Sequence, residues 1–284
     1  SSTSKDTISS QSIDPVLQKN LEQRLKTLGL NSSVKAKKLA VALIDITDID
    51  QPKVATVNGD RMMYAASLPK IAILFGAFQR IEDGDLELND ETRELMTRMI
   101  RYSSNQAASQ VLDLVGKEYL ATLLQSPEYR LYDVARNGGL WVGKSYGKAG
   151  AWKRDPLHNL SHGATAVQAA RFYYMLEKGQ LVSPQLTVDM KEILSKPSIT
   201  HKFVKGLQAI HPQAEVYRKS GTWKQWHSDS VMVEHDGHRY IAVALAESPQ
   251  GGKWLSDLIV AIDEIVCPVD VPDFSRPTQQ IFVF

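Results

Sequence analysis

The chain has 284 residues, a formal net charge of +1 and 43% hydrophobic residues. This length permits one large domain or two lobes that share a core. The nearly balanced charge, without any basic block, argues against partners such as nucleic acid or an anionic surface. No apolar run of about eighteen residues predicts a transmembrane helix.

In chain order, the hydrophobic pattern predicts an α/β part that is interrupted by a helical part. Strands are expected at 38–46, 53–58, 215–219, 227–234 and 240–246, and flanking helices at 15–28 and 254–266. Asp236-Gly237 lies between the last two strands and indicates a hairpin turn. Residues 67–200 are expected to be mostly helical, and residues 268–284, which contain three prolines, to form an extended tail.

This order of elements predicts the fold class α+β, with a mainly antiparallel sheet flanked by the terminal helices and an inserted all-helical domain. We expect residues 1–66 and 201–284 to form the sheet domain and residues 67–200 the inserted domain. Clefts between domains are common ligand sites. The two parts should therefore form one catalytic unit with its site at their interface.

The most informative motif is Ser67-Leu68-Pro69-Lys70, which directly precedes an apolar run. If Ser67 opens a helix, Lys70 lies one turn later on the same face, and the two side chains can touch. The Ser67 hydroxyl would also lie near the positive end of the helix dipole. This arrangement suits a serine that must lose its proton and attack a carbonyl. Taken alone, the motif is more typical of an N-capping serine with a surface lysine.

Two further motifs favour the catalytic interpretation. Ser103-Ser104-Asn105 comes next in the chain, and Lys219-Ser220-Gly221-Thr222 lies far downstream. In this order the three motifs correspond, with conservative changes, to a Ser-x-x-Lys, Ser-Asp-Asn and Lys-Thr-Gly set. The chain therefore resembles the serine β-lactamase and penicillin-binding protein superfamily, most closely the class A β-lactamases, over most of residues 15–265.

The resemblance implies a role for each motif residue. Ser67 would be the nucleophile that forms an acyl-enzyme, and either Lys70 or a carboxylate-bound water would accept its proton. Ser103 would pass a proton to the leaving nitrogen, and Lys219 would face the substrate carboxylate. The residues implied to position or bind the substrate are Asn105, Ser220, Gly221 and Thr222, and the N–H groups of Ser67 and Thr222 would form the oxyanion hole.

The sequence also departs from the class A pattern in the segment that follows Ser67. Ser103 follows Ser67 by only 36 positions, fewer than in the class A pattern. The shortened segment usually supplies an aromatic wall, so we expect a more open site with no substitute for that ring. Ser104 replaces the usual aspartate at a position that is generally structural, so we expect altered packing with the chemistry retained.

The carboxylate that would activate the deacylating water has two possible assignments. Asp155-Pro156-Leu157-His158-Asn159 is the nearest match to the Glu-Pro-x-x-Asn element of class A enzymes, which makes Asp155 a catalytic candidate. Alternatively, the loop begins at 129–133 and ends at 162–166, in which case Asp155 only approaches a helix. The sequence does not decide between them.

The glycine-rich stretch 137–147 suggests a hairpin or irregular loop near the site. Either it carries Trp141 or Tyr146 to the rim of the cleft, or it packs on the helical part. Trp223, directly after the third motif, is a better candidate for contact with substrate.

Other residues argue against a metal or disulfide framework. Cys267 is the only cysteine, so it excludes an internal disulfide and is expected to be structural. His158 and His162 lack a nearby third ligand, so no zinc site and no other cofactor are expected.

The sequence thus predicts a serine hydrolase that acts through an acyl-enzyme on a small-molecule substrate, with β-lactam hydrolysis as the first interpretation. A D,D-peptidase or esterase of the penicillin-recognising type is one alternative, and a β-lactam- or peptidoglycan-binding module that is acylated without turnover is another. We expect a monomer. The resemblance implies a periplasmic or secreted location, and the polar N-terminus would suit a mature chain whose export signal has been removed.

Overall fold

The computed structural model describes residue 8 and residues 13–269, and its centre is a five-stranded sheet in the order β2-β1-β10-β9-β8. The strands are β1 (Leu39–Asp45), β2 (Lys53–Val57), β8 (Glu215–Trp223), β9 (Trp226–His235) and β10 (His238–Glu247). Every neighbouring pair is antiparallel. Asp236 and Gly237 join β9 to β10 with φ angles of +51° and +76°, as a two-residue hairpin turn of type I′ requires. The predicted sheet and hairpin are confirmed.

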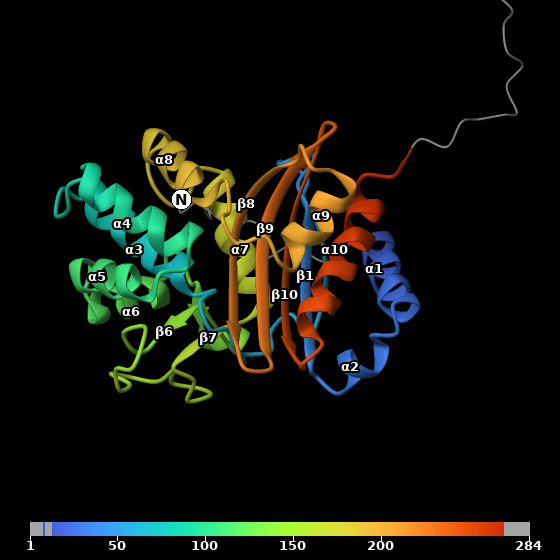
Figure 1. Ribbon diagram of the computed structural model, residues 1–284, viewed down its shortest axis with the longest axis horizontal. Helices are drawn as coiled ribbons and strands as arrows, with labels where there is room; N and C mark the ends of the chain where they lie inside the picture. The colour runs from blue at the N-terminus through green and yellow to red at the C-terminus, as the bar shows by residue number, and fades with distance from the viewer. Residues whose placement is uncertain (1–7, 9–12, 270–284) are drawn as a thin grey trace, which may run out of the picture.

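The sheet is a middle layer, because successive side chains of each strand point to opposite faces and both faces are covered. On one face, Val41 and Val233 pack with the terminal helices, whereas on the other Ala42 and Val243 join a larger core with the inserted helices. The covering helices are α1 (Pro15–Thr27), α9 (Phe203–Ile210) and α10 (Gly251–Val266) on the first face, and α7 (Ala166–Glu177) on the second. The helix α3 (Lys70–Glu82) belongs to the same larger core as α7. Figure 1 shows α1, α9 and α10 on one side of the sheet and the remaining large helices on the other.

The helical part surrounds α3, whose residues from Lys70 to Gln79 are all buried. A helix that is buried on every side is apolar all round, as this sequence is. The neighbouring helices are α4 (Asp90–Arg101), α5 (Asn105–Val115), α6 (Lys117–Gln125) and α8 (Pro184–Leu194), and the short α2 (Asn31–Lys35) follows α1. Asn89 and Thr92 form a capping box that fixes the start of α4, because each satisfies an otherwise unpaired backbone N–H group.

A long connection between α6 and α7 folds back against the segment before Ser67. It contains β4 (Tyr132–Asp133), the 3₁₀ helix η2 (Val134–Arg136), β5 (Gly138–Gly139), β6 (Trp141–Val142) and β7 (His162–Ala164). β7 pairs with both β6 and β3 (Met63–Tyr64). The connection is therefore tied to the chain directly upstream of the Ser67 motif.

These observations confirm the α+β class with helices inserted between strands. The boundaries proposed for the two domains stay a prediction, and α7, from the inserted part, packs directly on the sheet. The predicted tail falls mostly outside the described residues. Within the described part of the chain, no helix is both long enough and apolar enough to cross a membrane.

Candidate active site

A pocket of about 470 Å³ lies between the long connection and the end of β8. Ser67 lines it from the turn before α3, Asn105 from the start of α5, and Thr222 from β8. Its other lining residues are Tyr64, Ala66, Lys144, Tyr146, Gly147, Arg154, Leu160, Ser161, His162 and Trp223. Residues from all three motifs therefore meet here although they are far apart in the sequence.

Ser67 lies in a tight turn that precedes the helix, so the expectation that Ser67 itself opens α3 is wrong. The helix begins at Lys70, and Lys70 N donates to Ser67 O over 3.1 Å within the turn. Ala66 has a φ of +50°, an uncommon conformation for a side chain that is not glycine. Ser67 is partly exposed toward the pocket. Its hydroxyl has no hydrogen-bond partner among the residues that the structure describes.

Lys70 is fully buried beneath this turn. Its Nζ donates to Ser103 O over 2.8 Å, to Asn105 Oδ1 over 2.9 Å and to Ser103 Oγ over 3.2 Å. Burial lowers the pKa of Lys70 to about 7, because a desolvated ammonium is disfavoured relative to the neutral amine. A large fraction of Lys70 is therefore neutral near pH 7 and able to accept a proton.

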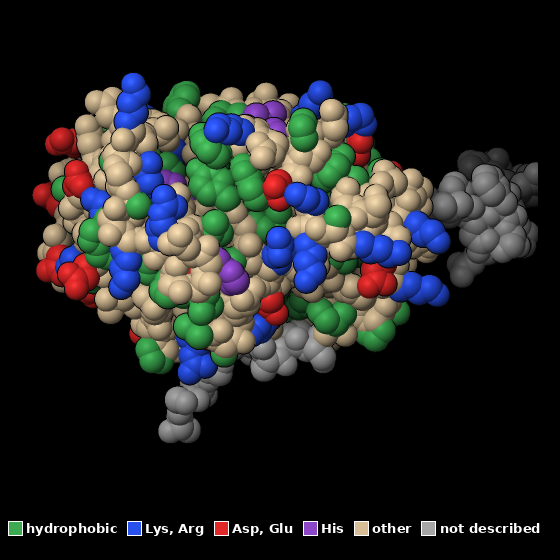
Figure 2. Space-filling view, turned by 90° about the horizontal axis from the view of Figure 1, so that it is seen from below, with side chains coloured by type: hydrophobic (Ala, Val, Ile, Leu, Met, Phe, Trp, Pro, Cys, Tyr) green, Lys and Arg blue, Asp and Glu red, His purple; other side chains and the backbone are tan. Residues whose placement is uncertain are grey.

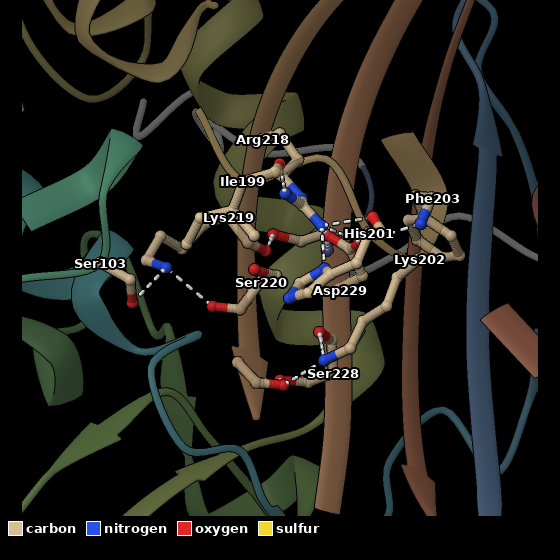
Figure 3. Close-up of polar contacts among 12 residues, drawn as sticks. Ser103, Ile199, His201, Lys202, Phe203, Arg218, Lys219, Ser220, Ser228 and Asp229 are labelled. Carbon is tan, nitrogen blue, oxygen red and sulfur yellow. Dashed lines mark hydrogen bonds and ion pairs between the residues drawn. The ribbon is translucent and has the colours of Figure 1, made fainter. Parts of the chain in front are cut away.

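Ser103 connects Lys70 to the sheet. Its φ of +56° turns its carbonyl and its hydroxyl toward the same lysine. Lys219 Nζ, from β8, donates to Ser103 Oγ over 3.0 Å (Figure 3). Burial, and secondarily the charge of Lys70, hold the pKa of Lys219 well below its usual range. The Ser103 hydroxyl thus lies between two amines, as a proton relay requires.

Ser104 has the structural role that we expected. Its Oγ accepts from Ala107 N over 3.1 Å and caps the start of α5. This cap positions Asn105, the first residue of the helix, against Lys70.

A buried ion pair that the sequence interpretation missed supports β8 behind the site. Arg218 Nε and one of its terminal nitrogens each donate to Asp229 over 2.8 Å, with both residues at most 3% exposed. Asp229 also accepts from Phe203 N at the start of α9, as Figure 3 shows. The one sequence signal was an aspartate in the buried strand pattern of 227–234, since a buried carboxylate requires a partner.

Lys202 is a second missed residue behind β8. It is 3% exposed, and its Nζ donates to Gly221 O and to Thr222 Oγ1, both over 2.6 Å. It therefore fixes the Thr222 hydroxyl next to the pocket.

Gly221 is required for a different reason than expected. A Cβ atom there would lie 2.4 Å from Ala65 O and 2.8 Å from Ser67 N, distances that no side chain tolerates. The glycine thus lets β8 lie directly against the Ser67 turn. Ser228 Oγ donates to Ala65 O over 3.0 Å and fastens the same contact. Ser220, beside it, is 4% exposed.

Asp155 is not brought to the pocket. It is 3% exposed, and Oδ1 accepts from the hydroxyl of Tyr132 and from the N–H groups of Leu157 and His158. Oδ2 accepts from Leu160 N over 2.6 Å. Both oxygens are therefore used to close a tight turn. Tyr132 belongs to the alternative loop start at 129–133, so the two segments proposed as alternatives are in contact.

Aromatic rings line the pocket, which corrects the expectation that no ring substitutes for the missing aromatic wall. Tyr146 stacks on His162 with centroids 4.0 Å apart, and Lys70 Nζ lies 4.6 Å from its ring centre. The Tyr146 hydroxyl donates to Ala66 O over 2.9 Å. On the opposite side, Trp223 packs on Tyr64 with centroids 5.4 Å apart.

The two aromatic residues of the stretch 137–147 take different ones of the two expected roles. Trp141 is fully buried and its indole donates to Lys153 O over 2.9 Å, so it packs inside the molecule. Tyr146 lines the pocket. Trp223 does so as well, and it is 49% exposed.

Potential metal donors gather away from the pocket in the described part of the chain. His235 is common to two such groups, one with His211 and Asp236 and one with Asp263 and Cys267. Both ring nitrogens of His235 already contact carboxylate oxygens, at 2.8 Å and 2.7 Å. These side chains therefore satisfy one another without an ion. Cys267 is buried and free.

Comparison with known proteins agrees with this geometry. No curated protein matches the chain in sequence. Among solved structures, a β-lactamase from Sphaerobacter thermophilus DSM 20745 superposes with a TM-score of 0.70 at 14% identity, over 89% of this chain and 98% of that one. PBP-A gives a TM-score of 0.65 at 17% identity, over 89% and 96%. A β-lactamase from Chitinophaga pinensis DSM 2588 gives 0.67 at 16%, over 87% and 97%.

These similarities show the fold. The family model described as "Beta-lactamase enzyme family" matches residues 18–93 and 91–266, which is most of the chain. With the serine, lysine and asparagine side chains of three separate motifs around one pocket, the chain belongs to the β-lactamase enzyme family.

Proposed function

We propose that this protein is a serine acyl-transferring hydrolase that reacts with β-lactams through a covalent ester on Ser67. The observation that carries the proposal is the hydrogen-bonded chain from Lys70 through the Ser103 hydroxyl to Lys219. It lies beside a serine hydroxyl that is free to react and is open to the pocket.

In the acylation step, the Ser67 oxygen bonds to the lactam carbonyl carbon while neutral Lys70 takes the hydroxyl proton. The carbon–nitrogen bond of the ring then breaks, and the Ser103 hydroxyl supplies a proton to the leaving nitrogen. Lys219 and Lys70 are both placed to return a proton to Ser103. The relay from Lys70 through Ser103 to Lys219 is already connected by contacts of at most 3.2 Å. The Ser67 hydroxyl, which has no hydrogen-bond partner in the described structure, has to approach Lys70 before its proton moves.

The N–H groups of Ser67 and Thr222 are the proposed oxyanion hole. Support comes from the close approach of β8 to the Ser67 turn, where a Cβ on Gly221 would lie 2.8 Å from Ser67 N. An N–H donor of this kind contributes about 10²–10³ to the rate in other acyl transferases.

We further propose that hydrolysis of the ester is the slow step. No Asp or Glu is among the residues that line the described pocket, and Asp155 is fully engaged elsewhere. A deacylating water therefore lacks the carboxylate that would activate it. This observation favours a second candidate function. The protein would be a penicillin-recognising protein that is acylated on Ser67 and then hydrolyses the acyl ester very slowly. A mutant of PBP-A has been solved as an acyl-enzyme complex with penicillin G.

Intact mass spectrometry after addition of benzylpenicillin tests the proposal. We expect a single adduct whose mass equals that of the added penicillin, and Ser67→Ala should abolish it. Decay of the adduct over minutes would indicate a hydrolase with turnover, and an adduct stable for hours would favour the acylated binding protein. Full labelling of Ser67→Ala would refute Ser67 as the nucleophile.

A further inference from the structure

The described pocket is lined by two basic side chains and by no acidic one. Lys144 and Arg154 both belong to the long connection between α6 and α7. They lie on the side of the pocket that also contains Ser161 and His162, whereas Thr222 and Trp223 of β8 line the other side. Figure 2 shows the underside of the molecule, where acidic side chains gather at the helical end and Lys and Arg predominate across the middle.

Neither cation is neutralised within the described part of the protein. Lys144 Nζ donates to Gly147 O over 3.2 Å, and Arg154 donates to Asn159 O over a long 3.4 Å. Neither residue forms an ion pair with a carboxylate of the described chain. Other basic residues of this fold do have such partners, among them Arg80 with Asp85 and Arg93 with Asp189. Two unpaired cations beside a concave site create a field that attracts anions.

The two buried lysines of the site lie elsewhere than Lys144 and Arg154 and already have partners. Lys70 and Lys219 are bonded to Ser103 and to other oxygens at the floor of the pocket. A substrate that extends from β8 to the connection would therefore have an anion-binding residue at each end. His162, which is 3% exposed, adds no charge, because burial lowers its pKa to about 4.

We propose that the substrates of this site carry a second anionic group, in the acyl part of the molecule, which Arg154 and Lys144 bind. This inference rests on the proposed function of Ser67 and names its substrate class. The acyl donor is a dianion with one carboxylate near Lys219 and Thr222 and another near Arg154. A β-lactam with a carboxylated side chain has this chemistry, and so does a peptide with a free carboxylate beside the scissile bond.

Two penicillins that differ by one carboxylate provide the test. Carbenicillin is benzylpenicillin with an added carboxylate in its acyl side chain. We would measure the second-order rate of adduct formation for both by intact mass spectrometry, and take the ratio of carbenicillin to benzylpenicillin. Because a charge-assisted hydrogen bond is about twice as strong as a neutral one, the ratio should fall about tenfold or more in Arg154→Gln. Lys144→Gln should lower it in the same direction.

Lys153→Gln is the matched control, because it removes the same charge from the neighbouring exposed residue, which does not line the pocket. The ratio should keep its wild-type value in this variant. Equal losses in Arg154→Gln and Lys153→Gln would mean that only the general field of the loop matters and would overturn direct recognition. A wild-type ratio at or below one would overturn it as well. If neither penicillin forms an adduct, the proposed function fails, and the inference fails with it.

Discussion

Tyr146 covers the buried amine of Lys70, and we predict that its ring keeps a large fraction of this lysine neutral and able to accept a proton. Burial lowers the pKa of Lys70 from 10.5 to about 7. At pH 7 the Lys70 amine is therefore neutral in about half of the molecules, compared with roughly one molecule in three thousand for an unperturbed lysine. Tyr146→Ala would open a path for water beside Nζ, which now lies 4.6 Å from the ring centre.

Two effects oppose each other in that variant. Loss of the cation–π contact would lower the pKa, by less than one unit because such contacts contribute about 0.5–1 kcal/mol at partly exposed sites. Hydration of the ammonium would raise it toward 10.5, and burial is the larger cause of the present shift. The net expectation is a raised pKa and an acylation rate at pH 7 that is about ten- to a hundredfold lower.

The assay is the pH dependence of the acylation rate with benzylpenicillin between pH 5 and pH 10. In the wild type the rate should rise with pH through about 7 and then level off, because the neutral amine is the base. Tyr146→Ala should shift this rise to higher pH, so that the wild-type rate is largely recovered in alkaline solution. Tyr146→Phe keeps the ring, loses only the bond to Ala66 O, and serves as the control with little shift. An Ala profile that overlays the wild type, or that shifts to lower pH, would refute the reasoning.

Three further predictions follow from buried contacts. Asp155→Asn should lower the free energy of unfolding by about 1–3 kcal/mol, since it leaves a buried donor without its acceptor. The lifetime of the acyl-enzyme should stay within about twofold of the wild-type value. A lengthened lifetime would instead support the water-activating role. Gly221→Ala should slow acylation about a hundredfold by displacing the N–H of Ser67, as measured by adduct formation, and an unaffected rate would contradict the close contact. Burial alone would lower the pKa of His235, but its bonds to two aspartates raise it. His235 should therefore stabilise the fold fully below about pH 6.5 and lose that contribution as pH rises through the raised pKa. Urea unfolding of the wild type and of His235→Asn at pH 5.5 and 8.5 measures this contribution. Equal pH dependence in the two proteins would exclude it.

The sequence predicted the site where the chemistry depends on short motifs. Ser67 and Lys70 are three residues apart, so the turn before α3 and the first residue of the helix place them next to each other in the chain. The meeting of Ser103 with Lys219 is a long-range contact, and it was predicted only because the three motifs resemble a known set in the same order. Composition and periodicity alone would have left these two residues unconnected.

Asp155 and Gly221 show why local patterns were insufficient. The Asp155-Pro156 pattern resembles a catalytic element, yet a short carboxylate followed by a turn also bonds readily to its own backbone N–H groups, and the structure uses it in this way. Gly221 was expected to make room for substrate. Its actual neighbour is the turn at Ser67, 154 residues earlier in the chain, and only the pairing of β8 with that turn reveals it.

The described pocket contains the groups that acylation needs, but its lining has no carboxylate to activate the water that deacylation needs. Acylation needs a neutral amine, a relay hydroxyl and N–H donors. Lys70 and the Ser103 hydroxyl are hydrogen-bonded to each other, and β8 lies directly against the N–H of Ser67. Deacylation needs a base for water. The described lining offers no carboxylate for this, and the ring of Tyr146 lies against Lys70 instead. The same lack of acidic groups in the described lining is the basis of both proposals, slow hydrolysis of the ester and binding of an anionic substrate by Arg154 and Lys144. If both proposals hold, Tyr146→Glu should shorten the lifetime of the acyl-enzyme and lower the ratio of carbenicillin to benzylpenicillin acylation together, because it adds the missing carboxylate beside Lys70.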